Sequence, residues 1–435
     1  MACVFAAGAY ALAYDSPRTD MSLARLPLML TVLALWGIAH LVVRRVANGA
    51  DALLLPVVAV LHGMGFVMIA RLANKWADLQ TVWSVVGVGA FLAVLVLVDR
   101  PLDLRRWQWT CLGAGLVLLV LPMVPGLGFT SGGARIWVSI GPINFQPGEF
   151  AKILLAVFFA AYLDERRTLI VQSERRLWGL ILPEMRHLAP IAVAWGLSVL
   201  VMVGQRDLGS SLMFFSLFVV MLWVATEKTG YLVVGSALFL AGATAAYFLF
   251  DHVRSRVEVW LDPWSRFTDR GYQPVKALFG MANGGLWGEG LGNGQPSAIP
   301  AAHNDFIFAA IGEELGMMGA AAVLAAYVLL VGAGMRVALR AQRDFEKLLA
   351  VGLTTILAVQ TFIIIGGVLR VVPLTGVTLP FMSYGGSSLV SNYVVLALLV
   401  RMSDATAREL REVPDTPGVR EKILMRLARR REARR

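Results

Sequence analysis

The chain has 435 residues, of which 57% are hydrophobic and 16% are charged. Ordinary soluble domains carry roughly 25% charged residues, so this composition excludes an average water-soluble enzyme. The 39 Lys and Arg residues outnumber the 29 Asp and Glu residues, giving a formal net charge of +10. In a chain with long apolar runs, such an excess indicates the orientation of membrane helices, and we expect no nucleic-acid partner.

Long apolar segments alternate with polar stretches along the whole chain. An α-helix needs about 20 apolar residues to cross a hydrocarbon layer of ~30 Å, and irregular backbone does not face lipid. The sequence therefore predicts an all-α, polytopic membrane helix bundle of about 12 transmembrane helices. The expected helices cover residues 2–14, 25–43, 52–71, 80–98, 107–123, 149–163, 188–204, 208–225, 231–250, 305–333, 347–371 and 389–402.

The basic residues predict the orientation of this bundle. Roughly two thirds of the Lys and Arg residues fall on the side that would hold both termini, which is the cytoplasmic side by the positive-inside rule. We therefore expect a multi-pass protein of the cytoplasmic (inner) membrane, with residues 124–148 and one long loop, residues 251–304, outside. Long ordered loops are usually functional, so the active site is expected to face outward.

Three sections are predicted along the chain: amino-terminal membrane helices in residues 1–104, a core with an outer cavity in residues 105–404, and a basic cytoplasmic tail in residues 405–435. The tail is interpreted as a solvated segment near anionic lipid headgroups, with docking of a partner as the alternative. The aromatic and Gly-rich loop 251–304 indicates that part of it lies amphipathically on the outer leaflet.

Glu149 and Lys152 lie three residues apart at the start of an apolar helix, so they share one helix face. Ionisable groups at membrane depth are costly and should face a cavity or each other. Two interpretations stay open. The residues form an ion pair that pins the helix start, or Arg135 above and Lys152 below form a cationic site for an anionic group such as a pyrophosphate.

Two aspartates lie at junctions between polar and apolar sequence. Asp207 joins two apolar runs with no room for a loop, which predicts a tight hairpin with Asp207 capping the second helix. Asp305 precedes an apolar helix and could cap it, or act as a partly desolvated general base with a raised pKa. Glu313 and Glu314 lie about two turns deeper, and we expect a structural role for at least one.

The last outer connection, residues 373–388, is rich in Gly, Pro and hydroxyl side chains. Backbone without regular structure at membrane depth is tolerated only where protein or a cavity surrounds it. The stretch is therefore interpreted as a broken, re-entrant element beside a cavity, with simple packing as the alternative.

Five stretches together resemble the SEDS family of bacterial cell-wall proteins, the RodA and FtsW group. In chain order they are GARIWVSIGPINFQPGEFAK, WLDPW with the following GYQ, GGLWGEGLGNG, AHNDFIFAAIGEELG and PLTGVTLPFMSYGGSS, between about residues 105 and 402. The SYGGSS end and the VLRVVPLTG variant are more like the RodA branch, of actinobacterial type. The resemblance implies a ten-helix core, here with about two further amino-terminal helices.

The resemblance also implies an activity: an inverting peptidoglycan glycosyltransferase that polymerises lipid II on the outer face of the membrane, for cell elongation and shape. The family's essential carboxylate falls on Asp305. No cofactor is certain, and no metal site made of side chains is expected, although a divalent cation (Mg²⁺ or Mn²⁺) at the pyrophosphate stays open. The expected substrate-binding residues are Arg135, Trp137, Gln146, Glu149, Lys152, His303, Ser387 and Ser388.

The chain departs from the family's pattern at six positions, none of which is a proposed catalytic group. Arg370 stands where the family usually has Gly, and it adds an outer-face charge to which sequence reasoning assigns no role. The other departures are Ile136, Gly148, Arg206, Asn304 and Ile364.

The chain has no G-x-x-x-x-G-K-[ST] element, so a glycosyl donor must bring its own leaving group. It also has no Ser followed three residues later by Lys, the arrangement of penicillin-binding acylation sites. Cross-linking must then come from another protein, and the resemblance implies a class B penicillin-binding protein (transpeptidase). Two rival hypotheses are a lipid II flippase and a non-catalytic scaffold for that partner. The clustering of candidate residues on the outer side favours the enzyme.

Overall fold

A computed structural model shows the fold of the chain. It describes residues 2–14, 26–72, 74–131, 133–141, 143–172, 175–177, 180–182 and 185–412. Most of the predicted basic tail, residues 413–435, lies outside the described residues.

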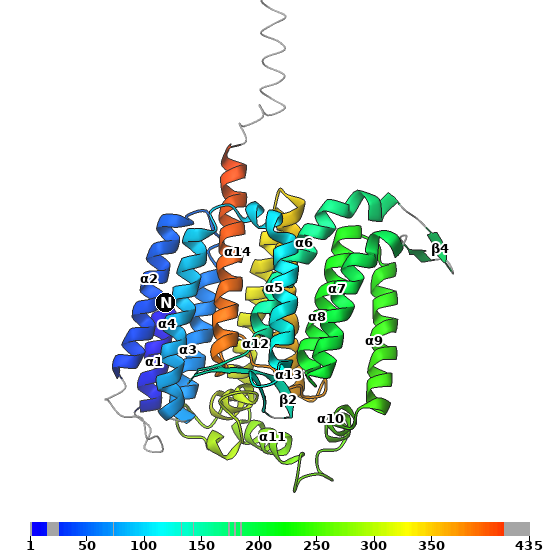
Figure 1. Ribbon diagram of the computed structural model, residues 1–435. Helices are drawn as coiled ribbons and strands as arrows, with labels where there is room; N and C mark the ends of the chain where they lie inside the picture. Colours follow the sequence, from blue (N-terminus) through cyan, green and yellow to red (C-terminus); the bar gives the residue numbers. More distant parts are fainter. Residues whose placement is uncertain are drawn as a thin grey trace, which may run out of the picture.

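The molecule is a bundle of long α-helices that run side by side (Figure 1). Within the described residues, eight helices are long and apolar enough to cross a membrane. They are α2 (Leu26–Val46), α3 (Leu54–Leu72), α4 (Asn74–Leu97), α8 (Leu208–Thr226), α9 (Gly230–Leu249), α12 (Ile307–Arg340), α13 (Asp344–Val368) and α14 (Gly386–Glu412).

Four further helices complete the predicted set. They are α1 (Ala2–Tyr14), α5 (Gln108–Val120), α6 (Gly148–Gln172) and α7 (Met185–Gly204). Each of the twelve segments expected from the sequence is thus helical, and the predicted polytopic bundle is confirmed. The 13 residues of α1 extend only about 20 Å at 1.5 Å per residue, so α1 is too short to cross the hydrocarbon layer by itself.

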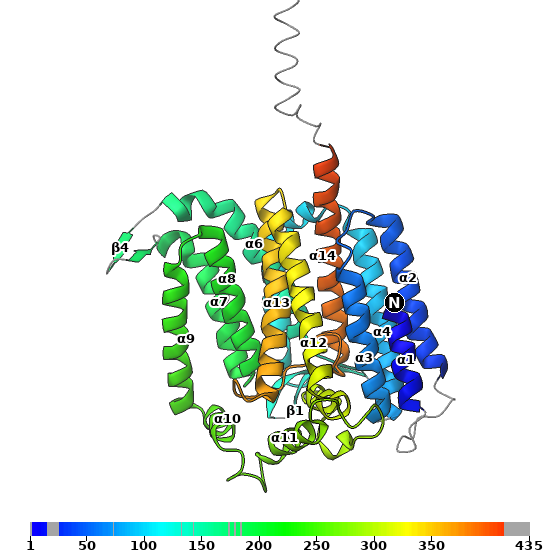
Figure 2. The same ribbon diagram turned by 180° about the vertical axis from the view of Figure 1, so that it is seen from behind.

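The helices differ strongly in burial. Of the apolar membrane-spanning segment of α14, 89% is buried inside the protein, and α14 runs through the bundle beside α4 and α12 (Figures 1 and 2). Of the corresponding segment of α9, only 6% is buried. Since apolar side chains such as Leu240 and Leu249 cover the exposed surface of α9, this helix lies at the edge of the bundle and faces lipid.

One end of the bundle carries a small antiparallel sheet in the order β1-β2-β3 (Figure 1). The strands are β1 (Gly128–Ser131), β2 (Ala134–Ile140) and β3 (Ile143–Phe145), and Trp137 of β2 lies opposite Phe129 of β1. Sequence analysis expected only that this segment, within residues 124–148, lies on the outer side of the bundle. The sheet adds to the all-α prediction, and its strands are short and partly exposed, so they leave no clear alternating pattern.

The long loop 251–304 contains two helices, α10 (Asp251–Leu261) and α11 (Tyr272–Gly284), which lie at the same end of the bundle as the sheet (Figures 1 and 2). The remaining short elements of the described chain are the 3₁₀-helices η2 (Pro101–Trp107), η3 (Leu121–Met123) and η4 (Pro296–Ala298), and the strand pair β4 (Arg175–Leu177) and β5 (Leu180–Leu182).

Two buried acids of α12 hold the Gly-rich part of this loop in place. The Glu313 carboxylate accepts a hydrogen bond of 2.8 Å from the backbone N–H of Gln295. Glu314 forms an ion pair of 3.2 Å with Arg71, whose guanidinium also donates to the carbonyl oxygens of Gly292 and Gly294. The predicted structural role is therefore confirmed for both acids.

Candidate active site

The start of α6 carries a buried ion pair. The Lys152 ammonium donates to Glu149 Oε2 at 2.6 Å and to Gln360 Oε1 of α13 at 3.1 Å. Lys152 is 0% exposed and Glu149 is 5% exposed, so neither charge is left without a partner. This is the ion pair of the first interpretation, and it pins the start of α6 to α13.

A hydroxyl cluster on α14 and the preceding loop extends this pair. Ser391 donates to Glu149 Oε2 at 2.9 Å. The amide nitrogen of Gln360 donates to the carbonyl oxygen of Thr378 at 2.9 Å and to Ser388 Oγ at 3.3 Å, and the Thr378 hydroxyl lies 2.7 Å from Ser388 Oγ. The broken connection before α14 is therefore joined to the Glu149–Lys152 pair, as a re-entrant element beside a polar site should be.

Two predicted substrate-binding residues connect the sheet end to α14. The backbone N–H of Gln146 donates to Ser387 Oγ at 2.9 Å. Trp137 lies on β2, in the strand next to the one that leads to Gln146, and its side chain is half-buried. The end of the sheet thus holds Gln146 at the start of α14, with Trp137 on the adjoining strand.

Arg135 lies at the start of β2 and is half-buried. Its backbone N–H donates to the carbonyl oxygen of Gln205 at 3.0 Å. Within the described residues its guanidinium reaches only backbone carbonyls, those of Val124 at 3.4 Å and Gly128 at 3.5 Å, and both bonds are long. Among the described contacts, none joins Arg135 to Lys152, and the cationic site that the two would form around an anionic group stays a prediction.

Asp305 lies two residues before α12, and the structure tests the interpretation that it caps this helix. The helix begins at Ile307, its N-cap is Phe306, and no side chain caps it. The helix-cap interpretation of Asp305 is therefore wrong. Instead the carboxylate lies against the backbone of Gly376, since a methyl group built on that glycine would be 3.6 Å from Asp305 Oδ2.

Burial raises the pKa of Asp305 to about 6, and the nearby Arg256 guanidinium partly opposes this rise. A carboxyl group with this pKa is mostly ionised at neutral pH, yet it is a stronger base than an ordinary aspartate. This is the property that the general-base interpretation requires.

Arg256 of α10 is a residue that sequence analysis missed. Its Nη1 donates to the carbonyl oxygens of Thr375 at 2.7 Å and Leu374 at 3.3 Å. Burial lowers the pKa of Arg256, whereas Asp207 and Asp305 both raise it. A basic residue on a short amphipathic helix gives no special signal in the sequence, because its hydrogen-bond partners lie 118 and 119 residues away.

Asp207 lies close enough to Glu149 and to Arg256 for both charges to affect its pKa. It is the N-cap of α8 and accepts a hydrogen bond of 3.0 Å from the backbone N–H of Ser210, which confirms the predicted cap. The preceding Arg206 has a φ of 61°, the left-handed backbone of the predicted tight hairpin. Burial raises the pKa of Asp207, with Glu149 raising it further and Arg256 lowering it. The charges of Glu149 and Arg256 therefore both act on the Asp207 carboxyl group.

His303, two residues before Asp305, belongs to an aromatic cluster with Trp76 and Tyr384. Its ring stacks on Trp76 with centroids 5.0 Å apart and an interplanar angle of 16°. Tyr384 lies 4.6 Å from Trp76 by ring centroids, and its backbone N–H donates to the carbonyl oxygen of His303. Burial lowers the pKa of His303, so this ring is neutral at pH 7.

No group of three His, Cys, Asp or Glu side chains within the described residues could hold a metal ion. A divalent cation bound by pyrophosphate oxygens would draw most of its ligands from the substrate. Such a cation stays a prediction.

The family model for FtsW, RodA and SpoVE proteins, described as cell cycle protein, matches residues 45–408. The described helices in this region are α3 to α9 and α12 to α14, together with the two short helices of the long loop, whereas α1 and nearly all of α2 precede it. The matched region thus contains the ten-helix core that the resemblance implied, with two helices before it.

Curated relatives cover most of the chain. The peptidoglycan glycosyltransferase RodA of Mycobacterium tuberculosis (strain ATCC 25618 / H37Rv) is 46% identical over 396 residues, which are 88% of this chain and 84% of that protein. RodA of Mycobacterium leprae is 45% identical over 392 residues, 88% and 83% of the two chains.

Two solved structures are similar in fold. A chain from a peptidoglycan synthase complex, studied for its coordination of polymerization and crosslinking, has a TM-score of 0.67 and 30% identity, and covers 82% of this chain and 98% of its own. The crystal structure of the Thermus thermophilus rod shape determining protein RodA has a TM-score of 0.59 and 25% identity, and covers 81% and 96%. The chain belongs to the FtsW/RodA/SpoVE family.

Proposed function

We propose that the chain is a peptidoglycan glycosyltransferase of RodA type that polymerises lipid II into glycan strands. Relatives named peptidoglycan glycosyltransferase RodA are up to 46% identical to it, in agreement with the enzyme class expected from the sequence. The observation that carries the proposal is the environment of Asp305. Its carboxylate lies against Gly376, burial raises its pKa, and the charge of Arg256 acts on it.

In this function Asp305 is the general base. It accepts the proton of the 4-hydroxyl of the GlcNAc unit of an incoming lipid II. The oxygen then forms a bond to the anomeric carbon of the terminal MurNAc of the growing chain. The bond from that carbon to undecaprenyl pyrophosphate breaks, with inversion, and the pyrophosphate leaves with the electron pair.

Cationic groups stabilise the charge that builds on the leaving pyrophosphate. Arg135 suits this role, because the two bonds that its guanidinium makes to described residues are long bonds to carbonyl oxygens, and it can turn to a phosphate. Lys152 has shorter bonds to Glu149 and Gln360 and is fully buried. We therefore assign Lys152 to positioning of the α6 start, a change from its expected place in direct contact with the pyrophosphate.

Gln146, Trp137, His303, Ser387 and Ser388 are proposed to bind the sugars and the pyrophosphate around Asp305. Support comes from the sheet and the loop before α14, which bring Gln146 to Ser387 and connect Ser388 to the Glu149 network. The neutral ring of His303, stacked on Trp76, offers an apolar face of the kind that packs against a sugar ring.

The chain is a multi-pass membrane protein, and we propose that its sheet end faces outward with both termini in the cytoplasm. The excess of basic residues at the opposite end supports this orientation. We also propose a class B penicillin-binding protein as partner. Support comes from the similar chain in a peptidoglycan synthase complex that polymerises and crosslinks.

The test uses the purified full chain with its transpeptidase partner and labelled lipid II, with glycan chains resolved on a gel. Asp305→Asn is expected to lower the polymerisation rate by about 10² to 10⁴, the usual contribution of a general base. Asp269→Asn is a matched control, because Asp269 is exposed on the same outer loop. Thermal unfolding shows that both variants fold.

A normal rate in folded Asp305→Asn protein would remove the proposed role of Asp305. If lipid II were instead carried across vesicles by that variant, the flippase hypothesis would replace the enzyme. If neither activity were found in the natural sequence with partner present, the scaffold hypothesis would stand.

A further inference from the structure

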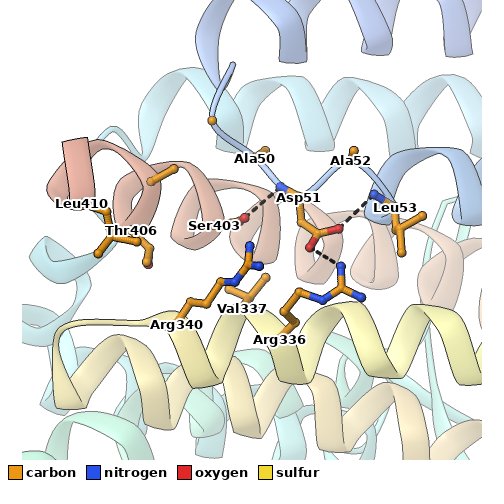
Figure 3. Close-up of a pocket in the computed structure, with 12 residues that line it drawn as sticks. Ala50, Asp51, Ala52, Leu53, Arg336, Val337, Arg340, Ser403, Thr406 and Leu410 are labelled. Carbon is orange, nitrogen blue, oxygen red and sulfur yellow. Dashed lines mark hydrogen bonds and ion pairs between the residues drawn. The ribbon is translucent and has the colours of Figure 1, made fainter.

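A pocket, whose lining Figure 3 shows, lies at the end of the bundle where α12 ends, whereas Asp305 precedes the start of α12. Figure 1 shows that α12 and α14 run from the sheet end to this opposite end. Its volume is about 260 Å³, and the turn between α2 and α3, the end of α12 and the last turns of α14 form its walls. Nothing in the proposed glycosyl transfer uses this end of the molecule. The polar residues that line it are Asp51, Arg336, Arg340, Ser403 and Thr406.

Asp51 is fully engaged within the wall of this pocket. Its Oδ2 forms an ion pair of 2.8 Å with Arg336 Nη1, and its Oδ1 accepts from the backbone N–H of Leu53 at 2.9 Å. The backbone N–H of Asp51 donates to Ser403 Oγ at 2.8 Å, as Figure 3 shows. Because one cation neutralises Asp51, any second cation in the lining gives the pocket a positive charge.

Arg340 is that second cation. It follows Arg336 by four residues on α12, so both side chains lie on one face of the helix, and Figure 3 shows its guanidinium extending from α12 toward α14. In the part of the chain that the structure describes, neighbouring basic residues have acidic partners, Arg343 with Glu409 and Arg408 with Asp404. No ion pair of Arg340 is found among those residues.

Thr406 provides a second, independent observation. Its side chain is 3% exposed and lines the pocket, yet its hydroxyl has no hydrogen-bond partner within the described residues. A threonine inside a helix commonly donates to the carbonyl four residues before it, as Thr226 does to Leu222. A buried hydroxyl without a partner is costly; this one is closed to solvent, and a turn of the Thr406 side chain toward an acceptor in the pocket would satisfy it.

We propose that this pocket binds the phosphate of an anionic phospholipid headgroup. Arg336 and Arg340 hold the phosphate oxygens, and Thr406 donates a hydrogen bond to one of them. The pocket lies at the ends of membrane helices, where headgroups lie, and basic pockets between such helices bind acidic headgroups. Leu53 and Leu410, 36% and 51% exposed, give the pocket an apolar rim for the start of an acyl chain.

The test places the purified full chain in nanodiscs of phosphatidylcholine with increasing phosphatidylglycerol, and counts bound lipids by native mass spectrometry. Arg340→Gln is expected to lower the affinity for phosphatidylglycerol about fivefold, the usual contribution of one basic residue near a headgroup. Thr406→Val should lower it by a smaller factor. Arg45→Gln is the matched control, since Arg45 is an exposed arginine near the same end that does not line the pocket.

A second arm adds inorganic phosphate to nanodiscs without anionic lipid and follows thermal unfolding. Loss of phosphatidylglycerol binding in Arg340→Gln but not in Arg45→Gln, with no effect of free phosphate, supports the headgroup site. Stabilisation by free phosphate that depends on Arg340 would overturn the headgroup in favour of a small anion. Equal behaviour of the two arginine variants in both arms would overturn the site, and none of these outcomes depends on glycan synthesis.

Discussion

Trp260 and Arg370 exchange hydrogen bonds in both directions. The indole N–H of Trp260 donates to the carbonyl oxygen of Arg370 at 2.9 Å, and the Arg370 guanidinium donates to the carbonyl oxygens of Trp260 at 2.8 Å and Leu261 at 3.0 Å. These bonds tie the end of α10 to the turn after α13. The extra outer-face charge of Arg370 therefore has a structural role. Arg256 of α10 makes a second contact with the same loop, at Thr375.

Arg370 has a φ of 59°, a left-handed backbone that costs an ordinary residue about 1–2 kcal/mol and glycine almost nothing. Arg370→Ala loses the guanidinium bonds to the carbonyl oxygens of Trp260 and Leu261 but keeps the backbone acceptor of the Trp260 indole, and it keeps this strain, so it should destabilise the protein by about 2 kcal/mol. Arg370→Gly loses the same bonds but relieves the strain, so its cost should be about 1 kcal/mol less. Unfolding in detergent measures both.

The two Arg370 variants also control for each other, because they remove the same guanidinium. Equal losses in Ala and Gly would show that the backbone at this position is not strained. If neither variant changed stability, the bonds that the Arg370 guanidinium donates to the end of α10 would make no contribution to stability.

The pH dependence of polymerisation tests the electrostatics around Asp305. A general base acts in its ionised form, so kcat/KM should fall as the pH drops below about 6, the pKa of Asp305. Arg256→Gln removes a cation that lowers this pKa, and should move the acid limb to higher pH. Rates between pH 5 and pH 8 with labelled lipid II measure both effects.

A lower plateau in Arg256→Gln with an unmoved acid limb would mean that Arg256 acts on binding and not on the base.

The stability of the folded protein gives a second measure of the Asp305 pKa. Because the folded pKa of Asp305 lies above its ordinary value of 3.8, its ionised form opposes folding at neutral pH. Asp305→Asn should therefore be more stable than the natural sequence at pH 7, with the difference fading as the pH falls from about 6 to about 4, between the folded and the ordinary pKa of Asp305.

The buried pair of Glu149 and Lys152 predicts a strong non-additivity. Glu149→Gln leaves the Lys152 ammonium buried without its counter-charge, and should destabilise the protein by about 3–5 kcal/mol. Lys152→Met should cost a similar amount. The double variant removes both charges and should recover most of the loss. Chemical unfolding of the four proteins in one detergent gives the coupling.

If the double variant lost the sum of the two single losses, the charges would not be coupled and the pairing at 2.6 Å would not matter for stability. Ser391→Ala gives a milder comparison, because it removes one neutral donor to the same Glu149 oxygen. Its expected cost is about 1–3 kcal/mol.

The sequence predicted the helices well because the signal for a membrane span, apolar length, lies within the segment itself. The two least accurate boundaries are the end of α14, which runs to Glu412 and not to 402, and the end of α6, which runs to Gln172 and not to 163. Charged residues after 163 indicated a loop, but they continue the helix and pair with distant groups, as Arg167 does with Asp344 at 2.7 Å. Such a partner is visible only in the fold.

The site was predicted in part for the same reason. Glu149 and Lys152 are three residues apart, and their contact follows from helical spacing alone. Their further partners Gln360 and Ser391 are more than 200 residues away along the chain, and nothing local marks them. For Asp305, position alone could not separate a cap from a base, since a difference of one residue in the helix start changes the role.

A hydrogen-bonded chain joins α3 and α4 to α14. His62 Nε2 of α3 lies 3.0 Å from Ser84 Oγ of α4, and His62 Nδ1 lies 2.7 Å from the Tyr393 hydroxyl of α14. Ser84 donates its single proton to the carbonyl oxygen of Gln80 at 2.6 Å, so toward His62 it must accept. The proton of His62 is therefore on Nε2, and Nδ1 accepts from Tyr393.

Tyr393→Phe removes the donor to His62 Nδ1 and leaves a buried acceptor without a partner, which should cost about 1–3 kcal/mol. His62→Phe should cost at least as much, since it also leaves the Tyr393 hydroxyl buried and unpaired. Once either partner is gone, the second change removes less, so a double-mutant cycle should give a coupling of about 0.5–3 kcal/mol. Additive losses would show that the bond at 2.7 Å does not hold α14 to α3, and that apolar packing alone joins these helices.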